Sequence, residues 1–213
     1  HYVIIAAMKL KLVYLLFFFS GLAGLIYEIV WGRLLVLVFG NTTQSMAAVI
    51  SAYMLGLGVG SLMAGKIVNK LDRKQALLLY ALLEAGVGIT GIATLILIPS
   101  TKLIYARISD GSQVTWLLLI IKLFLAEAIL VLPTLFMGAT LPVLVKWVKE
   151  QGHILEAALS RLYAVNTLGA VMGVLMAAGI MIEVLGLTNT ILVAGTLNLS
   201  IALVASRLVA YDE

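Results

Sequence analysis

Long apolar runs, interrupted by short polar segments, make up most of the chain. They predict helices over about residues 12–39, 44–67, 75–98, 116–145, 155–182 and 187–208. Each run has at least about 20 residues, the length that a helix needs to cross the hydrocarbon core of a bilayer. We therefore expect an all-α polytopic membrane protein with six transmembrane helices. They would form one domain over residues 8–213, and residues 1–7, which precede Met8, would be a non-native or disordered lead.

Prolines and small residues add detail to this pattern. We expect the third helix to end at Pro99 and the fourth to kink or break near Pro133, because proline removes a backbone donor and clashes with the preceding turn. The second helix carries a glycine ladder, Gly56, Gly58, Gly60 and Gly65. Glycines four apart let a second helix approach closely, which stabilises helix pairs in lipid. The hairpin of the first two helices is therefore the expected packing centre.

Two stretches of the chain resemble each other. Leu55–Ile67 and Leu168–Ile180 are identical at seven equivalent positions. If the resemblance is a true repeat, the chain consists of two inverted three-helix repeats, resembling half of a major facilitator transporter. The alternative is chance, because Gly, Ala, Leu and Met are common in all such helices.

Composition agrees with a membrane protein and excludes several other classes. Hydrophobic residues make up 63% of the chain and charged residues 11%, whereas soluble domains carry about 25% charged residues. The absence of cysteine excludes disulfides and thiolate metal sites. No cluster of His, Asp and Glu has the spacing of metal ligands, so we expect no metal. No basic patch is interleaved with aromatic residues, so we expect no nucleic-acid partner.

The distribution of Lys and Arg predicts the orientation. With a cytoplasmic N-terminus, ten basic residues lie on the inside and two on the outside. The inside set is Lys9, Lys11, Lys66, Lys70, Arg73, Lys74, Lys146, Lys149, Arg161 and Arg207, and the outside set is Lys102 and Arg107. Because short cytoplasmic loops are rich in Lys and Arg, we expect a multi-pass protein of the inner or plasma membrane with both termini in the cytoplasm.

Several ionisable or amide side chains interrupt the apolar runs. Counting from the helix ends at about 1.5 Å per residue places a group of them near the midplane, where they could converge: Glu84, Glu127, Asn166 and Asn198. Glu28 and Lys122 share the outer third and are candidate partners, and Arg33 near the outer surface can extend its charge to the interface.

These side chains have more than one interpretation. Charges in a membrane span face protein or water, because exposure to lipid is unfavourable. The candidate ligand-binding residues are Glu28, Glu84, Glu127, Asn166 and Tyr27, acting on a cation or as a proton relay, and the candidate structural residues are Lys122, Arg33 and Asn198. Interhelical hydrogen bonding alone, or neutral carboxylic acids, are the alternatives.

The loop after the second helix has an ordered set of charges. Gly65–Lys74 resembles the cytoplasmic signature of the major facilitator superfamily, with Gly65, Asp72 and Arg73 at its characteristic positions. An ordinary positive loop would explain the charges but not their order.

A wider resemblance rests on four motifs, Phe18–Trp31, Phe39–Thr43, Leu132–Pro142 and Tyr163–Ala170. In this order they resemble the membrane domain of fused major-facilitator/spermidine-synthase-like proteins. The resemblance implies a cytoplasmic aminopropyltransferase-like domain that binds decarboxylated S-adenosylmethionine or a related nucleotide. No glycine-rich nucleotide loop after a strand is found in these residues. We therefore expect no catalytic residue, no cofactor and no enzymatic activity in this chain alone.

Three functions fit these observations. In the first, the chain anchors a spermidine-synthase-like protein in the membrane and passes a polyamine or related cation to its cytoplasmic domain. In the second, it is a half-size major-facilitator-like transporter that acts as a dimer. In the third, it is a structural subunit of a larger membrane complex. The partners would be the lipid bilayer and, respectively, the aminopropyltransferase-like domain, a second copy, or other membrane subunits.

Overall fold

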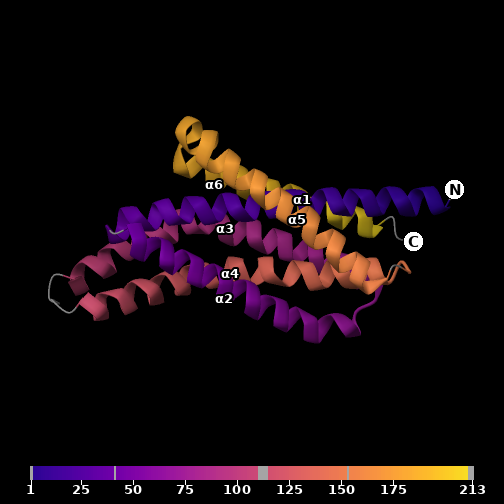
Figure 1. Cartoon of the computed structure of the whole chain (residues 1–213), viewed down its shortest axis with the longest axis horizontal. Coiled ribbons are helices and arrows are strands. Elements are labelled where there is room, and N and C mark those ends of the chain that lie inside the picture. The colour runs from indigo at the N-terminus through magenta and orange to yellow at the C-terminus, as the bar shows by residue number, and fades with distance from the viewer. Residues whose placement is uncertain (1, 41, 110–114, 153, 211–213) are drawn as a thin grey trace.

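The structure, a computed structural model, is helical throughout the parts of the chain that it describes, residues 2–40, 42–109, 115–152 and 154–210. The elements are α1 (Tyr2–Phe39), α2 (Thr42–Ile67), the 3-10 turn η1 (Val68–Lys70), α3 (Arg73–Ser109), α4 (Thr115–Lys149), α5 (Leu155–Met176), the π-helical turn η2 (Ala177–Met181) and α6 (Ile182–Ala210). The helices run along one axis as an elongated bundle (Figure 1).

The prediction of six transmembrane helices in two inverted repeats is wrong. In the described part of the chain, five helices are long and apolar enough to cross a membrane: Ala7–Phe39, Thr43–Lys70, Arg73–Arg107, Trp116–Lys149 and Leu155–Ala210. The last two predicted spans form one helical stretch because the backbone stays helical through η2 into α6. The major-facilitator-like repeat arrangement is not seen either.

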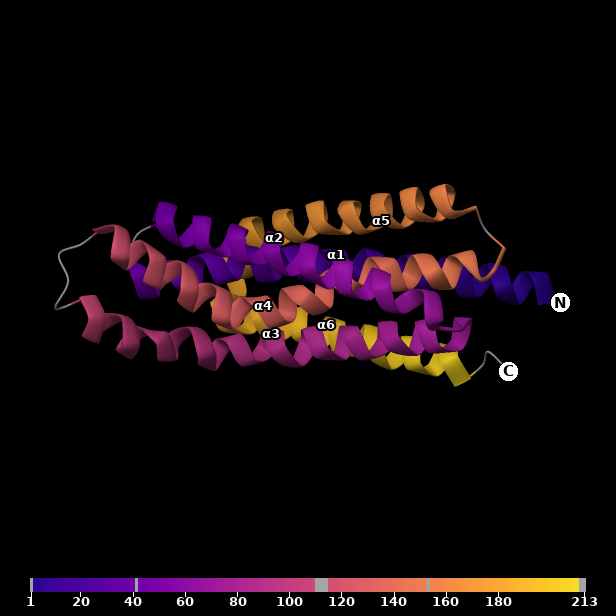
Figure 2. The same ribbon diagram turned by 90° about the horizontal axis from the view of Figure 1, so that it is seen from below.

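This long stretch changes direction at one residue near its middle. Gly186 lies inside α6 with φ 76° and ψ 172°, outside the helical region. Glycine adopts positive φ without the steric penalty of a side chain. Figures 1 and 2 show that the chain turns back there, so that α6 returns along the bundle and ends near the start of α1.

Two prolines lie where helix ends or breaks were expected. α3 continues through Pro99 to Ser109, so the predicted end at Pro99 is wrong, and α4 runs from Thr115 to Lys149 with Pro133 inside it. Hydroxyl groups next to the prolines bond to carbonyls of the preceding turn: Ser100 Oγ to Ile96 O at 2.8 Å and Thr134 Oγ1 to Leu130 O at 2.7 Å. Such bonds help membrane helices to accommodate proline.

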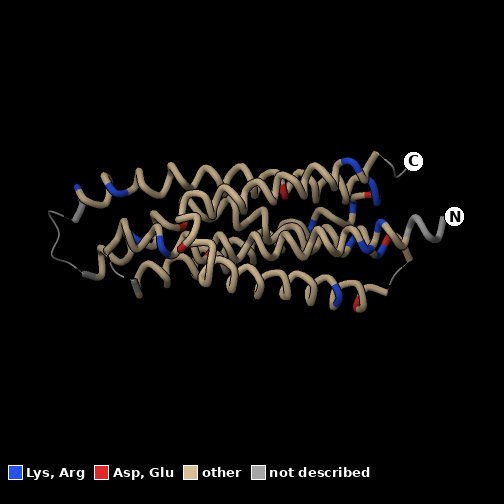
Figure 3. The backbone as a smooth tube through the Cα atoms, turned by 90° about the horizontal axis from the view of Figure 1, so that it is seen from above, with Lys and Arg blue, Asp and Glu red and all other residues tan. Residues whose placement is uncertain are grey.

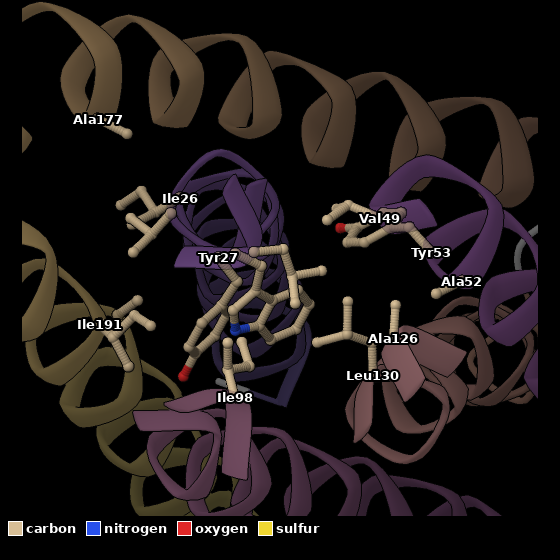
Figure 4. Packing of buried hydrophobic residues seen from close by; sticks show 14 of the residues in the cluster. Ile26, Tyr27, Val49, Ala52, Tyr53, Ile98, Ala126, Leu130, Ala177 and Ile191 are labelled. Carbon is tan, nitrogen blue, oxygen red and sulfur yellow. The ribbon is translucent and has the colours of Figure 1, made fainter. Parts of the chain in front are cut away.

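Buried side chains form two apolar clusters along the bundle. One contains Tyr27, Trp31 and Ile98, and the other contains Tyr80 and Trp147. In the first cluster, the ring of Tyr27 extends from α1 between Ile191 of α6 and Ile98 of α3 (Figure 4). Both clusters draw on α1, α2, α3, α4 and α6, so the two halves of the core are built by the same set of helices.

Glycines bring two pairs of helices into backbone contact. A Cβ added at Gly60 of α2 would overlap with the backbone of Leu135 in α4, and one added at Gly138 of α4 would overlap with Leu57 O. In the second pair, a Cβ at Gly169 or Gly173 of α5 would overlap with carbonyl oxygens of α1. We call these contacts the α2–α4 seam and the α1–α5 seam.

Candidate functional site

The centre of the candidate site is a carboxylate on α3 that is completely buried. The side chain of Glu84 is 0% exposed, and Asn198 of α6, 1% exposed, donates from Nδ2 to Glu84 Oε2 at 2.7 Å. The two residues are 114 positions apart in sequence, so the contact depends on the packing of α3 against α6. Hydrogen bonds between side chains of two helices stabilise the association of those helices in lipid.

Glu84 and Asn198 lie in a polar layer between the two apolar clusters. On α3, Leu83 belongs to the second cluster and Val87 to the first, and on α6, Ala194 and Ile201 bracket Asn198 in the same way. Ser20 has the same position on α1, between Phe17 of the second cluster and Leu22 of the first. The bundle therefore has a polar level near its middle.

Several hydroxyl groups surround the Glu84 carboxylate. Ser20 and Tyr80 place their hydroxyls against it, and the Tyr27 phenol is close enough to interact with its charge. Two buried atoms beside it have no hydrogen-bond partner among the described residues: Asn198 Oδ1 and Tyr27 Oη. Buried polar atoms in native proteins are nearly always paired with protein or ordered water, so this group has unused capacity to bind a small polar species.

The Tyr27 side chain is held by aromatic packing next to this group. Its ring stacks on Trp31 with centroids 5.2 Å apart, and Trp31 Nε1 donates to Thr94 Oγ1 at 2.9 Å. A Cβ at Gly91 would come within 2.6 Å of Tyr27 Oη, so the glycine leaves room for the phenol. These contacts fix the phenol between α1 and α3.

A second polar contact involves Lys122 of α4, which is 6% exposed. Its Nζ donates to Gln44 Oε1 of α2 at 2.6 Å and lies 5.3 Å from the centre of the Tyr105 ring. An ammonium near an aromatic face is stabilised by the ring quadrupole. Lys122 Nζ also lies 6.0 Å from the centre of the Phe39 ring of α1, so its contacts among the described residues lead to α1, α2 and α3 and not to Glu28, its expected partner.

The remaining acidic candidates lie elsewhere. Glu28 is partly buried and interacts electrostatically with the Tyr53 hydroxyl of α2. Glu127 is also partly buried, and its Oε2 atom has no partner among the described residues. Asn166 donates from Nδ2 to Phe17 O of α1 at 3.0 Å. Of the four midplane residues expected to converge, the contacts between described residues join Glu84 with Asn198.

Two sets of candidates are near the ends of the bundle. Arg33 is exposed and lines an apolar groove with Gly32 and Met46. In the loop before α3, Asp72 Oδ1 accepts from Gln75 N at 2.8 Å and Asp72 N donates to Gln75 Oε1 at 3.1 Å. This reciprocal pair is a capping box that satisfies backbone donors at the helix start. It gives Asp72 a structural role, and Gly65 and Arg73 are exposed.

A cavity lies beside the polar layer. Its volume is about 120 Å³, and it is lined by residues of α1, α2, α4 and α5: Ser20, Gly21, Gly24, Leu25, Tyr53, Leu57, Met137, Thr140 and Asn166. Ser20 is thus shared between the cavity and the surroundings of Glu84.

Sequence reasoning missed Ser20, Tyr80, Gln44 and Thr94. Tyr80 precedes Glu84 by four residues, so helical spacing alone places the two on one face. The other three depend on which helices are neighbours, and no pattern within one helix carries that information.

Comparisons with known proteins give one curated relative. The chain is 26% identical over 180 residues to the polyamine aminopropyltransferase of Leptospira interrogans, a match over 84% of this chain and 32% of the relative. The chain therefore spans about a third of the length of this enzyme. No family model matches the chain. No solved structure gives a significant match.

Proposed function

We propose that this chain is the membrane domain of a polyamine aminopropyltransferase-like protein and that it anchors such a protein at the cell membrane. The observation that carries the proposal is the match over 84% of this chain to 32% of an enzyme with that name. The matching region coincides with helices long and apolar enough to cross a membrane. An apolar segment of this size makes attachment to lipid its simplest contribution to a larger protein.

The proposed orientation places both ends of the chain in the cytoplasm, where an attached enzyme would meet its soluble substrates. Five helical stretches among the described residues allow this because the fifth, Leu155–Ala210, turns back at Gly186. In support, the described ends of α1 and α6 lie at the same end of the bundle (Figure 1). Basic residues gather at this end and are sparse at the other (Figure 3). This asymmetry is the one by which positively charged loops mark the cytoplasmic side.

The orientation can be tested with single cysteines because the natural sequence has none. Lys70→Cys, at the end of η1, and Lys102→Cys, near the far end of α3, form a matched pair of exposed lysines. With a membrane-impermeant maleimide on intact cells, we expect labelling of Lys102→Cys alone. Lys70→Cys should react only after permeabilisation. Labelling of both or neither in intact cells, or of Lys70→Cys alone, would overturn the proposed topology.

A second proposed role is the binding of a cation by Glu84, with Tyr27, Glu28, Glu127 and Asn166 as further candidates. The observation that favours it is a fully buried carboxylate, Glu84, that hydroxyl and amide groups surround and that no Lys or Arg of the described residues contacts. Intramembrane acidic residues commonly mark ion or substrate pathways. The relative's name makes a polyamine the first cation to test.

The cation role is tested by uptake of labelled spermidine into proteoliposomes. We expect Glu84→Gln to abolish uptake and Glu156→Gln, an exposed carboxylate at the start of α5, to leave it unchanged. Cross-linking of active vesicles would show whether a dimer forms. No uptake by the folded wild-type protein would refute the role and favour a structural subunit.

A further inference from the structure

The cavity beside the polar layer has a lining that differs from the apolar clusters above and below it. Four of its side chains carry hydroxyl or amide groups: Ser20, Tyr53, Thr140 and Asn166. They come from four different helices, α1, α2, α4 and α5, so the polar lining is a product of the bundle and not of one helix. Its volume of about 120 Å³ is well above the roughly 10–15 Å³ that a cavity needs to hold one water. Polar cavities of sufficient size hold ordered water, whereas apolar ones stay dry.

Ser20 joins this cavity to the Glu84 carboxylate. Its side chain lines the cavity on one side, and its hydroxyl faces the carboxylate on the other. A serine hydroxyl donates one hydrogen bond and accepts others, so it can take a proton from one neighbour while giving one to the next.

An independent observation also indicates a small polar occupant. Asn198 Oδ1 and Tyr27 Oη are buried and have no partner within the described residues. Burial of a polar group without a hydrogen bond is unfavourable. Water reaching Glu84 from the Ser20 side would satisfy part of this group.

We propose that this cavity is a hydrated proton-exchange site, in which water meets the Ser20 hydroxyl and Ser20 passes protons to and from the Glu84 carboxyl group. In the release step, the Glu84 O–H bond breaks and its proton moves to Ser20 Oγ. The Ser20 hydroxyl proton moves at the same time to a cavity water, which becomes hydronium. Uptake is the reverse, so that Ser20 ends each step unchanged. The site goes beyond the anchoring role and does not depend on the identity of any cation.

Among the groups around the cavity, the Glu84 carboxyl group is the one that we expect to exchange protons. The titratable side chains that interact with it, among the described residues, are the phenols of Tyr27 on α1 and Tyr80 on α3, and α6 contributes the neutral Asn198 amide. No lysine or arginine in the described parts of the neighbouring helices interacts with this carboxylate. A paired basic side chain would favour loss of the proton from Glu84, and no such group lies there among the described residues.

Infrared spectroscopy of the purified full chain tests the proposal. We expect a band of a protonated carboxylic acid that is absent in Glu84→Gln and that shifts when H₂O is replaced by D₂O. Ser20→Ala should slow this shift at least tenfold. Ser100→Ala is the matched control, because this exposed hydroxyl on α3 bonds to Ile96 O at 2.8 Å and is remote in sequence from Glu84. An exchange rate that is unchanged in Ser20→Ala, or the absence of a Glu84 band at any pH, would overturn the proposal.

Cysteine labelling gives a second readout that does not require Glu84 to be protonated. Thr140→Cys places a thiol in the cavity wall, whereas Thr190→Cys places one at a buried site outside the cavity lining. With 2-aminoethyl methanethiosulfonate, we expect Thr140→Cys to react at least tenfold faster. Equal rates would mean that water does not enter the cavity. Labelling of Lys70→Cys and Lys102→Cys reports membrane topology separately, so failure of the anchoring proposal is distinguishable from failure of this one.

Discussion

The two seams and the Glu84 region both hold apolar helices together, but they do so by different interactions. In the α2–α4 seam, Gly56 and Gly60 let the backbone and side chains of α4 approach to where a Cβ would stand. Between α3 and α6, the Glu84–Asn198 hydrogen bond of 2.7 Å joins side chains. Apolar helices gain little by associating in lipid, because the acyl chains are as apolar as leucine. Close packing and interhelical hydrogen bonds are the remaining sources of specific association.

This difference determines what each region tolerates. A seam forms because its glycines have no side chain, so any larger residue at these positions disrupts it, whether that residue is polar or apolar. The polar contact depends on matched donors and acceptors, so a change of nearly the same volume is enough to disturb it. The seams therefore serve packing alone, whereas the polar region can also respond to protons or ligands.

The largest expected effect is in the α2–α4 seam. Gly60→Leu would place a side chain against the backbone of Leu135, which cannot rotate away. Overpacking of a core costs about 1–3 kcal/mol, and a clash with backbone belongs at the upper end or beyond. We expect loss of folded protein, measured as monodisperse yield and melting temperature in detergent.

Gly58→Leu is the control for this change. Gly58 lies two residues from Gly60 on the same helix, and an added Cβ would meet no described atom within 4 Å. Because leucine also has a higher helix propensity than glycine by about 1 kcal/mol, this variant should be as stable as wild type or more so. Equal damage from both substitutions would show that α2 does not pack as described.

A smaller effect is expected at the polar contact. Asn198→Leu removes the donor to Glu84 Oε2 and leaves a buried carboxylate without it, which should cost about 2–3 kcal/mol. The double variant Glu84→Leu/Asn198→Leu removes both partners and should be less destabilised than Asn198→Leu alone. Thermal unfolding of the four proteins of this cycle measures the coupling. Strictly additive effects would show that the two side chains do not interact.

The sequence predicted the chemistry of the two regions better than their partners. The spacing of four between Gly56 and Gly60 correctly indicated a close-packing face, but Gly58 and Gly65 of the same ladder face open space. Helical periodicity identifies a face, and it does not say which helix covers it. That α2 packs on α4 depends on contacts far apart in sequence.

The same limit applies to the candidate site. Depth along the helices placed Glu84 and Asn198 near one level, and the structure joins them. Asn166 was given a similar depth but bonds to Phe17 O, because its face of α5 meets α1. The position along a helix gives the depth of a side chain in the membrane. Which helix that side chain faces depends on how the helices are arranged around it. The count of spans was wrong for a related reason, since the residues before Gly186 remain helical through η2.

The smallest expected effect on stability is at an ion pair at the end of α4, away from the seams and from Glu84. Lys146 Nζ lies 2.7 Å from Glu150 Oε1, and this hydrogen bond, followed by the charge of Lys146, lowers the pKa of Glu150 below its usual value. A carboxylate with a lowered pKa in the folded state contributes stability above its unfolded pKa and loses it as the pH falls through the folded value. The melting-temperature difference between wild type and Glu150→Gln should therefore be small at neutral pH and shrink towards zero as the pH falls below the ordinary glutamate pKa of about 4.3. Because Glu150 is exposed, salt should also reduce the difference. A difference that grows on acidification would contradict the assigned pairing.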